Sequence, residues 1–122
     1  MAIHITAYQS RDTTETITLR NAAGESITLA GDDKIRIKIG RSGKTPLLDI
    51  LGGTALNGTT LTNVNPATLS LYAASLAPSI IKPGVYDLEA LVLDTADNNR
   101  LKHAESGVFV LIGTQLGQVG AS

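Results

Sequence analysis

One short segment limits most strongly what this chain can fold into. Residues 33–39 read Asp-Lys-Ile-Arg-Ile-Lys-Ile, so isoleucine alternates with a long cationic side chain. Successive side chains of a β-strand point to opposite faces of the sheet, and β-branched residues favour that conformation. The pattern predicts a half-buried antiparallel strand. Its buried face should hold Ile35, Ile37 and Ile39, and its exposed face should hold Lys34, Arg36 and Lys38.

Weaker alternation recurs through the first two thirds of the chain. It predicts an N-terminal strand beginning at Ile3 and Ile5, and a hairpin of residues 15–20 and 25–30 around a turn at 21–24. Shorter strands are expected at 45–51, 59–64 and 68–72, the first starting at a sheet edge because Pro46 cannot donate to a ladder. Gly52, Gly53 and Asn57-Gly58 predict a loose or exposed connection, and residues 73–80 predict one helical turn.

The last third of the chain is more regular. Pro83-Gly84 predicts a type II turn. Residues 85–94 carry apolar side chains on both faces, which favours a central strand. A polar turn at 95–99 leads to a last strand at 101–112, in which Gly107 predicts a bulge. The glycine-rich residues 113–122 read as a tail.

These signals predict an all-β fold. Turns roughly every 8–12 residues are typical of an antiparallel sandwich of about seven to nine strands. No linker or repeat divides the chain, so we expect one domain over residues 1–122, with an N-terminal strand and an extended tail from about 113. Tyr86, just after Pro83-Gly84, resembles the tyrosine corner of immunoglobulin-like domains, although their Cys-Trp-Cys signature is absent. We therefore predict that its hydroxyl bonds to the backbone of residues 77–82.

Composition argues against most catalytic and ligand-binding classes. The chain has no cysteine, two histidines and a net charge of −1, which leaves no thiol chemistry and no general attraction to nucleic acid. Aromatic residues make up 3%, which argues against a stacking platform for bases or sugars. The N-terminus lacks the features of a signal peptide, and no apolar run reaches the roughly 18 residues of a membrane span. We expect no cofactor, small-molecule substrate, nucleic acid or membrane contact.

Three motifs carry weak chemical signals. Gly43-Lys44-Thr45 ends like a phosphate-binding loop, but Lys38 stands where the motif needs glycine, so a hairpin turn is favoured. Residues 94–99 are rich in oxygen ligands, yet they miss the positions of a calcium loop. His103, Ser106 and Asp94 can be combined into a triad, but no nucleophile elbow supports it. We therefore expect no catalytic, cofactor-binding or metal-binding residues, and no enzymatic activity.

The row of Lys34, Arg36 and Lys38 permits two interpretations. It can be a solvated strand face that discourages edge aggregation. It can also be an electrostatic contact, either with Asp87 and Glu89 across strands or with a partner subunit. Both interpretations stay open at this level.

Four segments carry a family resemblance. They are Gly31-Asp32-Asp33-Lys34-Ile35-Arg36-Ile37, Pro46-Leu47-Leu48-Asp49-Ile50, Pro83-Gly84-Val85-Tyr86-Asp87-Leu88-Glu89 and Gly107-Val108-Phe109-Val110-Leu111. Their order resembles structural proteins of tailed-phage virions, in particular the N-terminal domain of siphophage upper-baseplate proteins. That family is a β-sandwich that docks on other virion subunits.

The resemblance implies a non-enzymatic virion component that works through protein–protein contacts, as a capsid-decorating or tail- or baseplate-associated protein. The protein would be made in the host cytoplasm and located in the virion, with other virion proteins and copies of itself as partners. The alternative is a carbohydrate-binding or adhesin-like sandwich, which would need exposed rings among Tyr8, Tyr72, Tyr86 and Phe109. We expect Tyr86 and Phe109 to be buried.

Interface residues are expected in two places. One is the basic row of Lys34, Arg36 and Lys38. The other is the chain ends, residues 1–5 and 113–122, which are predicted to lie against neighbouring subunits by β-augmentation. Leu116 and Val119 would be the small apolar anchors of the C-terminal end.

Overall fold

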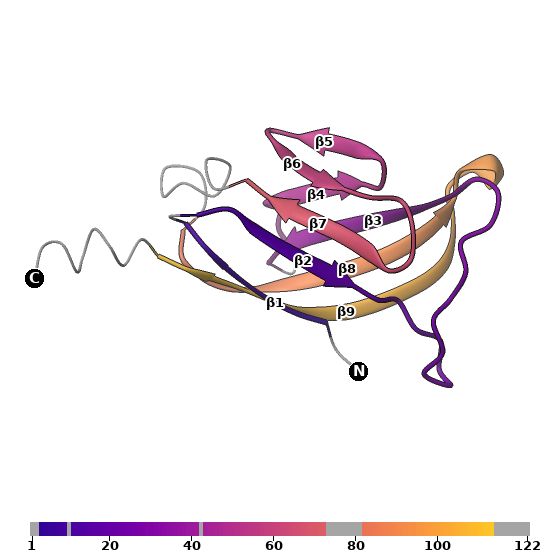
Figure 1. Ribbon diagram of the computed structural model, residues 1–122, viewed down its shortest axis with the longest axis horizontal. Helices are drawn as coiled ribbons and strands as arrows, with labels where there is room; N and C mark the ends of the chain where they lie inside the picture. Colours follow the sequence, from indigo (N-terminus) through magenta and orange to yellow (C-terminus); the bar gives the residue numbers. More distant parts are fainter. Residues whose placement is uncertain (1–2, 10, 42, 73–81, 114–122) are drawn as a thin grey trace, which may run out of the picture.

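A computed structural model describes residues 3–9, 11–41, 43–72 and 82–113. The chain is all-β in this part and forms a sandwich of two sheets (Figure 1). The five-stranded sheet has the order β1-β9-β8-β3-β4, and the four-stranded sheet has the order β2-β7-β6-β5. Neighbouring strands are antiparallel except β1 and β9, which are parallel. The strands are β1 (Ile3–Tyr8), β2 (Thr13–Ile17), β3 (Asp33–Gly40), β4 (Leu48–Leu51), β5 (Thr54–Leu56), β6 (Thr59–Leu61), β7 (Ala67–Leu71), β8 (Gly84–Asp94) and β9 (Arg100–Ile112).

The isoleucine face of β3 lies at the centre of the core, as predicted. Ile35 and Ile37 are 0% exposed and Ile39 is 2% exposed. Ile37 stands opposite Ala90 of β8 and Ile50 of β4, so it packs within a row of buried residues. Residues from both sheets complete this core, among them Ile5, Leu19, Leu61, Leu69, Leu71, Leu88, Phe109 and Leu111.

The predicted tyrosine corner is confirmed. Tyr86 is 4% exposed, and its hydroxyl donates a hydrogen bond to the carbonyl oxygen of Lys82. Its ring lies 6.5 Å from the ring of Phe109, centre to centre. Gly84, predicted in a type II turn, instead begins β8 with a φ of 153°, far from the roughly +80° of that turn.

The predicted hairpin of residues 15–30 is only partly correct. β2 covers Thr13–Ile17, and beyond it one bridge, Arg20 to Ser26, joins the two arms. Backbone hydrogen bonds from Ile27 to Leu19 and from Asn21 to Glu25 flank this bridge, and the side chain of Asn65 adds further hydrogen bonds to the arms. Its Oδ1 accepts from the backbone N–H of Leu19, and its Nδ2 donates to the carbonyl oxygens of Leu19 and Ile27.

Residues 52–58 contain a strand that the sequence interpretation missed. β5 pairs with β6 around Asn57 and Gly58, both of which have positive φ, 51° and 89°. This is the two-residue hairpin that an Asn-Gly pair signals. β4 lies at a sheet edge, as the proline predicted, but covers only Leu48–Leu51 of the expected 45–51. Residues 73–80, expected to hold a helical turn, lie outside the described residues.

Gly107 was expected to form a bulge, and this is wrong. It pairs regularly with Leu88, and the register shift between β8 and β9 lies at Val92/Leu93. Gly107 instead allows β1 to approach, because a Cβ there would lie 2.2 Å from the carbonyl oxygen of Ile3. From Ile3 onward, the N-terminal segment forms an edge strand of its own sheet, in agreement with the strand predicted to begin at Ile3 and Ile5.

Candidate interaction surface

The basic row lies on the outer face of the five-stranded sheet. Lys34, Arg36 and Lys38 are half-buried rather than exposed, which corrects the prediction. β3 lies between β8 and β4, so side chains of both neighbours flank the long cationic side chains. Leu116 and Val119, the other predicted interface residues, lie outside the described residues.

Arg36 is bound within the domain. Its Nε and Nη2 donate to the two carboxylate oxygens of Asp49 on β4, at 2.7 and 2.6 Å. These hydrogen bonds lower the pKa of Asp49 and raise the pKa of Arg36, and the charge of Lys38 lowers the pKa of Asp49 further. Glu89 stands opposite Lys38, as the cross-strand interpretation required, whereas Asp87 stands opposite Gly40. Basic side chains of β3 and acidic side chains of β4 and β8 are therefore interspersed on this part of the outer face. We call this group, Arg36, Lys38, Asp49 and Glu89, the charged mosaic.

Apolar side chains also lie on the outer face, in two groups on either side of Asp87 and Glu89. Val85 on β8 is 60% exposed and stands opposite Val110 of β9. Leu91 stands opposite Ala104, and Leu101 near the start of β9 is 54% exposed. Val108, Val110 and Ile112 continue the apolar surface along β9 and are half-buried. The side chains on a water-facing sheet surface are usually polar, so apolar side chains on this face are unusual.

The outer face of the four-stranded sheet provides a contrast within the same molecule. Thr14 and Thr60 both stand opposite Ser70, and Thr16 stands opposite Thr68. These hydroxyl side chains are exposed or half-buried. Because one sandwich carries a hydroxyl face on one side and an apolar, charged face on the other, exposure to water alone does not explain the apolar face.

A hollow of about 370 Å³ lies at the charged part of this face. Lys38, Arg41 and Lys44 line one side, and Asp87, Glu89 and Ser106 line the other. Arg41 also places its guanidinium 4.6 Å from the ring centre of Tyr86. The hollow therefore has basic groups on one side and acidic groups on the other.

The phosphate-loop motif is a turn, as favoured from the sequence. The N–H of Lys44 donates to the carbonyl oxygen of Arg41, and Gly43 has a φ of 78°. The chain then enters β4 after Pro46, with no helix whose N-terminus could hold a phosphate.

The other two motifs do not assemble a site. In the 94–99 loop, Arg100 contacts both acidic groups, with Asp97 at 2.7 Å and Asp94 at 3.6 Å. His103 lies 3.4 Å from Glu105, and Ser106 lines the hollow on the outer face beside Glu89. In the described ranges, no three His, Asp or Glu side chains are grouped as metal ligands.

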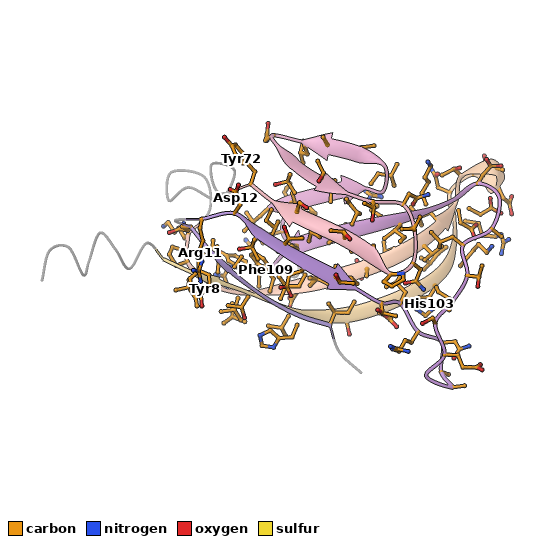
Figure 2. All side chains as sticks on the ribbon, viewed as in Figure 1. Tyr8, Arg11, Asp12, Tyr72, His103 and Phe109 are labelled. Carbon is orange, nitrogen blue, oxygen red and sulfur yellow. The ribbon has the colours of Figure 1, made fainter. Side chains whose placement is uncertain are left out.

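The aromatic side chains are spread through the molecule. Tyr86 and Phe109 are buried, as expected. The guanidinium of Arg11 lies 4.2 Å from the ring centre of Tyr8, and Figure 2 shows both at the end of the sandwich opposite His103. Tyr72 is 47% exposed. One ring exposed to this extent gives little support to a sugar-stacking platform.

The sequence signal for the apolar face was the two-sided pattern of residues 85–94. It predicted a central strand, and β8 is central in its sheet. The described residues place no second layer over that outer face. The described part of the chain also has no helix with the length and apolar character of a membrane span. No protein-family model and no curated protein matches the chain.

Proposed function

We propose that this protein is a non-enzymatic structural component of a tailed-phage virion, capsid-decorating or tail- or baseplate-associated, and that it acts through protein–protein contacts. We further infer that its sandwich is immunoglobulin-like, an inference that the Tyr86 corner supports. The observation that carries the proposed mode of action is the apolar outer face of the five-stranded sheet. The virion assignment draws on the family resemblance of the four segments.

The chemistry of this face suits a protein partner. Val85, Leu91 and Leu101 supply apolar area, whose removal from water drives association. The mosaic of Lys38, Glu89 and the Arg36–Asp49 pair would set orientation, because complementary charges fix register more than they add affinity. The predicted interface role of the basic row is thus extended to the apolar residues beside it.

The test compares one substitution on each outer face. Val85→Lys puts a charge into the apolar face at a side chain that is 60% exposed, so the domain should fold normally. Thr16→Lys puts the same charge on the hydroxyl face, where the side chain is also exposed. We expect both variants to keep the wild-type melting midpoint, and Val85→Lys alone to be lost from purified phage particles, as measured by quantitative mass spectrometry.

Two outcomes would contradict the proposal in different ways. Equal occupancy of both variants would show that the apolar face is not the contact. Absence of the wild-type protein from purified particles would show that it is not a virion component.

A further inference from the structure

One edge of the five-stranded sheet is formed by β1 (Figure 1). The N–H of Gln9 donates to the carbonyl oxygen of Ile112, so the odd-numbered residues of this strand direct their backbone groups toward β9. The carbonyl oxygen of Ile3 faces Gly107 of β9, in agreement. Backbone direction alternates along a strand. His4, Thr6 and Tyr8 therefore direct their N–H and C=O groups outward, where no described backbone group pairs with them.

This edge lacks the usual protection against strand pairing. Edges are commonly blocked by proline, charged side chains, bulges or shortness. β1 is six residues long, Ile3–Tyr8, and contains no proline, lysine, arginine or acidic residue. The other edges differ: β4 has four residues with Asp49 among them, β5 has three, and β2 has Glu15 at its centre.

The sequence of β1 is self-complementary in one register. Antiparallel pairing of two copies about a two-fold axis at Thr6 places Thr6 opposite Thr6, and His4 opposite Tyr8 of the second copy. The outward-directed residues then face one another, giving roughly six hydrogen bonds, two for each hydrogen-bonded pair. Ile5 falls opposite Ala7 of the second copy, a large side chain beside a small one. The same operation on β2 would place Glu15 opposite Glu15, where like charges destabilise the pair.

We propose that two copies of this chain pair through β1 in this register and join their five-stranded sheets into one continuous sheet. The interface is isologous, since each copy contributes the same strand. Beneath β1 lies a groove of about 910 Å³, lined by polar and charged residues such as Glu15 and Arg20 as well as by Ile3. The added strand lies beside this groove. The pairing goes beyond the proposed virion role and can hold or fail independently of it.

The test is a charge swap at the two-fold axis. The side chain of Thr6 lies on the outer face of the sheet and is half-buried, so lysine and glutamate are both compatible with the fold. We expect the wild-type chain to show a concentration-dependent dimer by analytical ultracentrifugation. Thr6→Lys and Thr6→Glu, each alone, should weaken dimerisation by about tenfold or more, because like charges face each other across the axis. An equimolar mixture of the two should recover a dimer, and native mass spectrometry should identify it as mixed.

Matched controls use Thr60→Lys and Thr60→Glu on the hydroxyl face of the other sheet, where the side chain is exposed. These variants should dimerise as the wild type does, alone or mixed. Because dimerisation itself raises the melting midpoint, circular dichroism and melting are measured at a concentration at which the wild type is monomeric. The Thr6 and Thr60 variants should then match, which separates loss of pairing from loss of fold. A wild-type chain that stays monomeric at millimolar concentration would overturn the proposal. So would Thr6 variants that dimerise like wild type, or a mixture that recovers no mixed dimer.

Discussion

Asp33 shows how a single residue joins two distant parts of the sandwich. Its side chain is 4% exposed, and its carboxylate accepts hydrogen bonds from the backbone N–H of Ala30 and from Nζ of Lys102, both at 2.9 Å. Lys102 falls at the register shift of β9, between the residues that pair with Val92 and Leu93. A bulge of this kind re-aims a side chain. The Ala30 bond first, and Lys102 next, lower the pKa of Asp33.

This ion pair predicts a specific dependence of stability on pH. Because the folded pKa of Asp33 lies below its ordinary value of 3.8, its contribution is full above that value and is lost as the pH falls through the folded pKa. We expect Asp33→Asn to lower the free energy of unfolding by about 1.5–3 kcal/mol at neutral pH, which is the net contribution of a hydrogen bond to a charged group. The difference in unfolding free energy from wild type should stay constant above about pH 5 and shrink below pH 4.

Urea denaturation of both proteins from pH 7 to pH 3 measures that difference. A gap that persists unchanged at pH 3 would mean that the Asp33 charge does not contribute. Asp87→Asn, at an exposed carboxylate, is the control for the general effect of removing one negative charge.

At the scale of elements, Gly107 determines how β1 joins its sheet. A Cβ at this position would lie 2.2 Å from the carbonyl oxygen and 2.8 Å from the carbonyl carbon of Ile3, so β1 would have to move. β1 contributes Ile5, which is 0% exposed, and the movement would disturb packing as well as pairing. We expect Gly107→Ala to cost about 1–3 kcal/mol, the usual range for overpacking.

Hydrogen exchange locates the effect of that substitution. The amides of Ile5 and Ala7 point toward β9 and should exchange faster in Gly107→Ala, whereas the amide of Ile37 should keep its protection. Ser106→Ala, one residue earlier on the outer face, should leave the exchange of β1 unchanged. Unchanged protection of Ile5 and Ala7 in the glycine variant would contradict this account of β1.

Across the whole molecule, stability should depend on the space between the sheets far more than on either outer face. Ile37 is fully buried at the middle of β3. Its truncation removes apolar contacts and leaves a cavity, so we expect Ile37→Ala to cost about 2–5 kcal/mol. Thr16→Ala, on the hydroxyl face, should change the unfolding free energy by less than about 0.5 kcal/mol. Equal melting midpoints for the two variants would contradict the assignment of the core.

Local patterns alone identified several features of the fold. The alternation of residues 33–39 determined β3 and its buried face, because a period of two is a property of neighbouring residues. Pro83-Gly84 with Tyr86 predicted the tyrosine corner, since its hydroxyl bonds to a carbonyl only four residues away. The apolar side chains on both faces of residues 85–94 predicted a central strand, because this pattern is again a property of neighbouring residues.

Features that depend on distant partners were decided by tertiary structure. No residue near Leu19 in the sequence predicts that Asn65, which is 46 residues away, completes its hydrogen bonds. The role of Gly107 depends on the close approach of Ile3 on the neighbouring strand. The basic row is half-buried only because β4 and β8 flank it. Local periodicity gives each strand two faces, but the pairing of strands decides which faces are covered. The apolar outer face and the edge position of β1 are therefore consequences of long-range pairing.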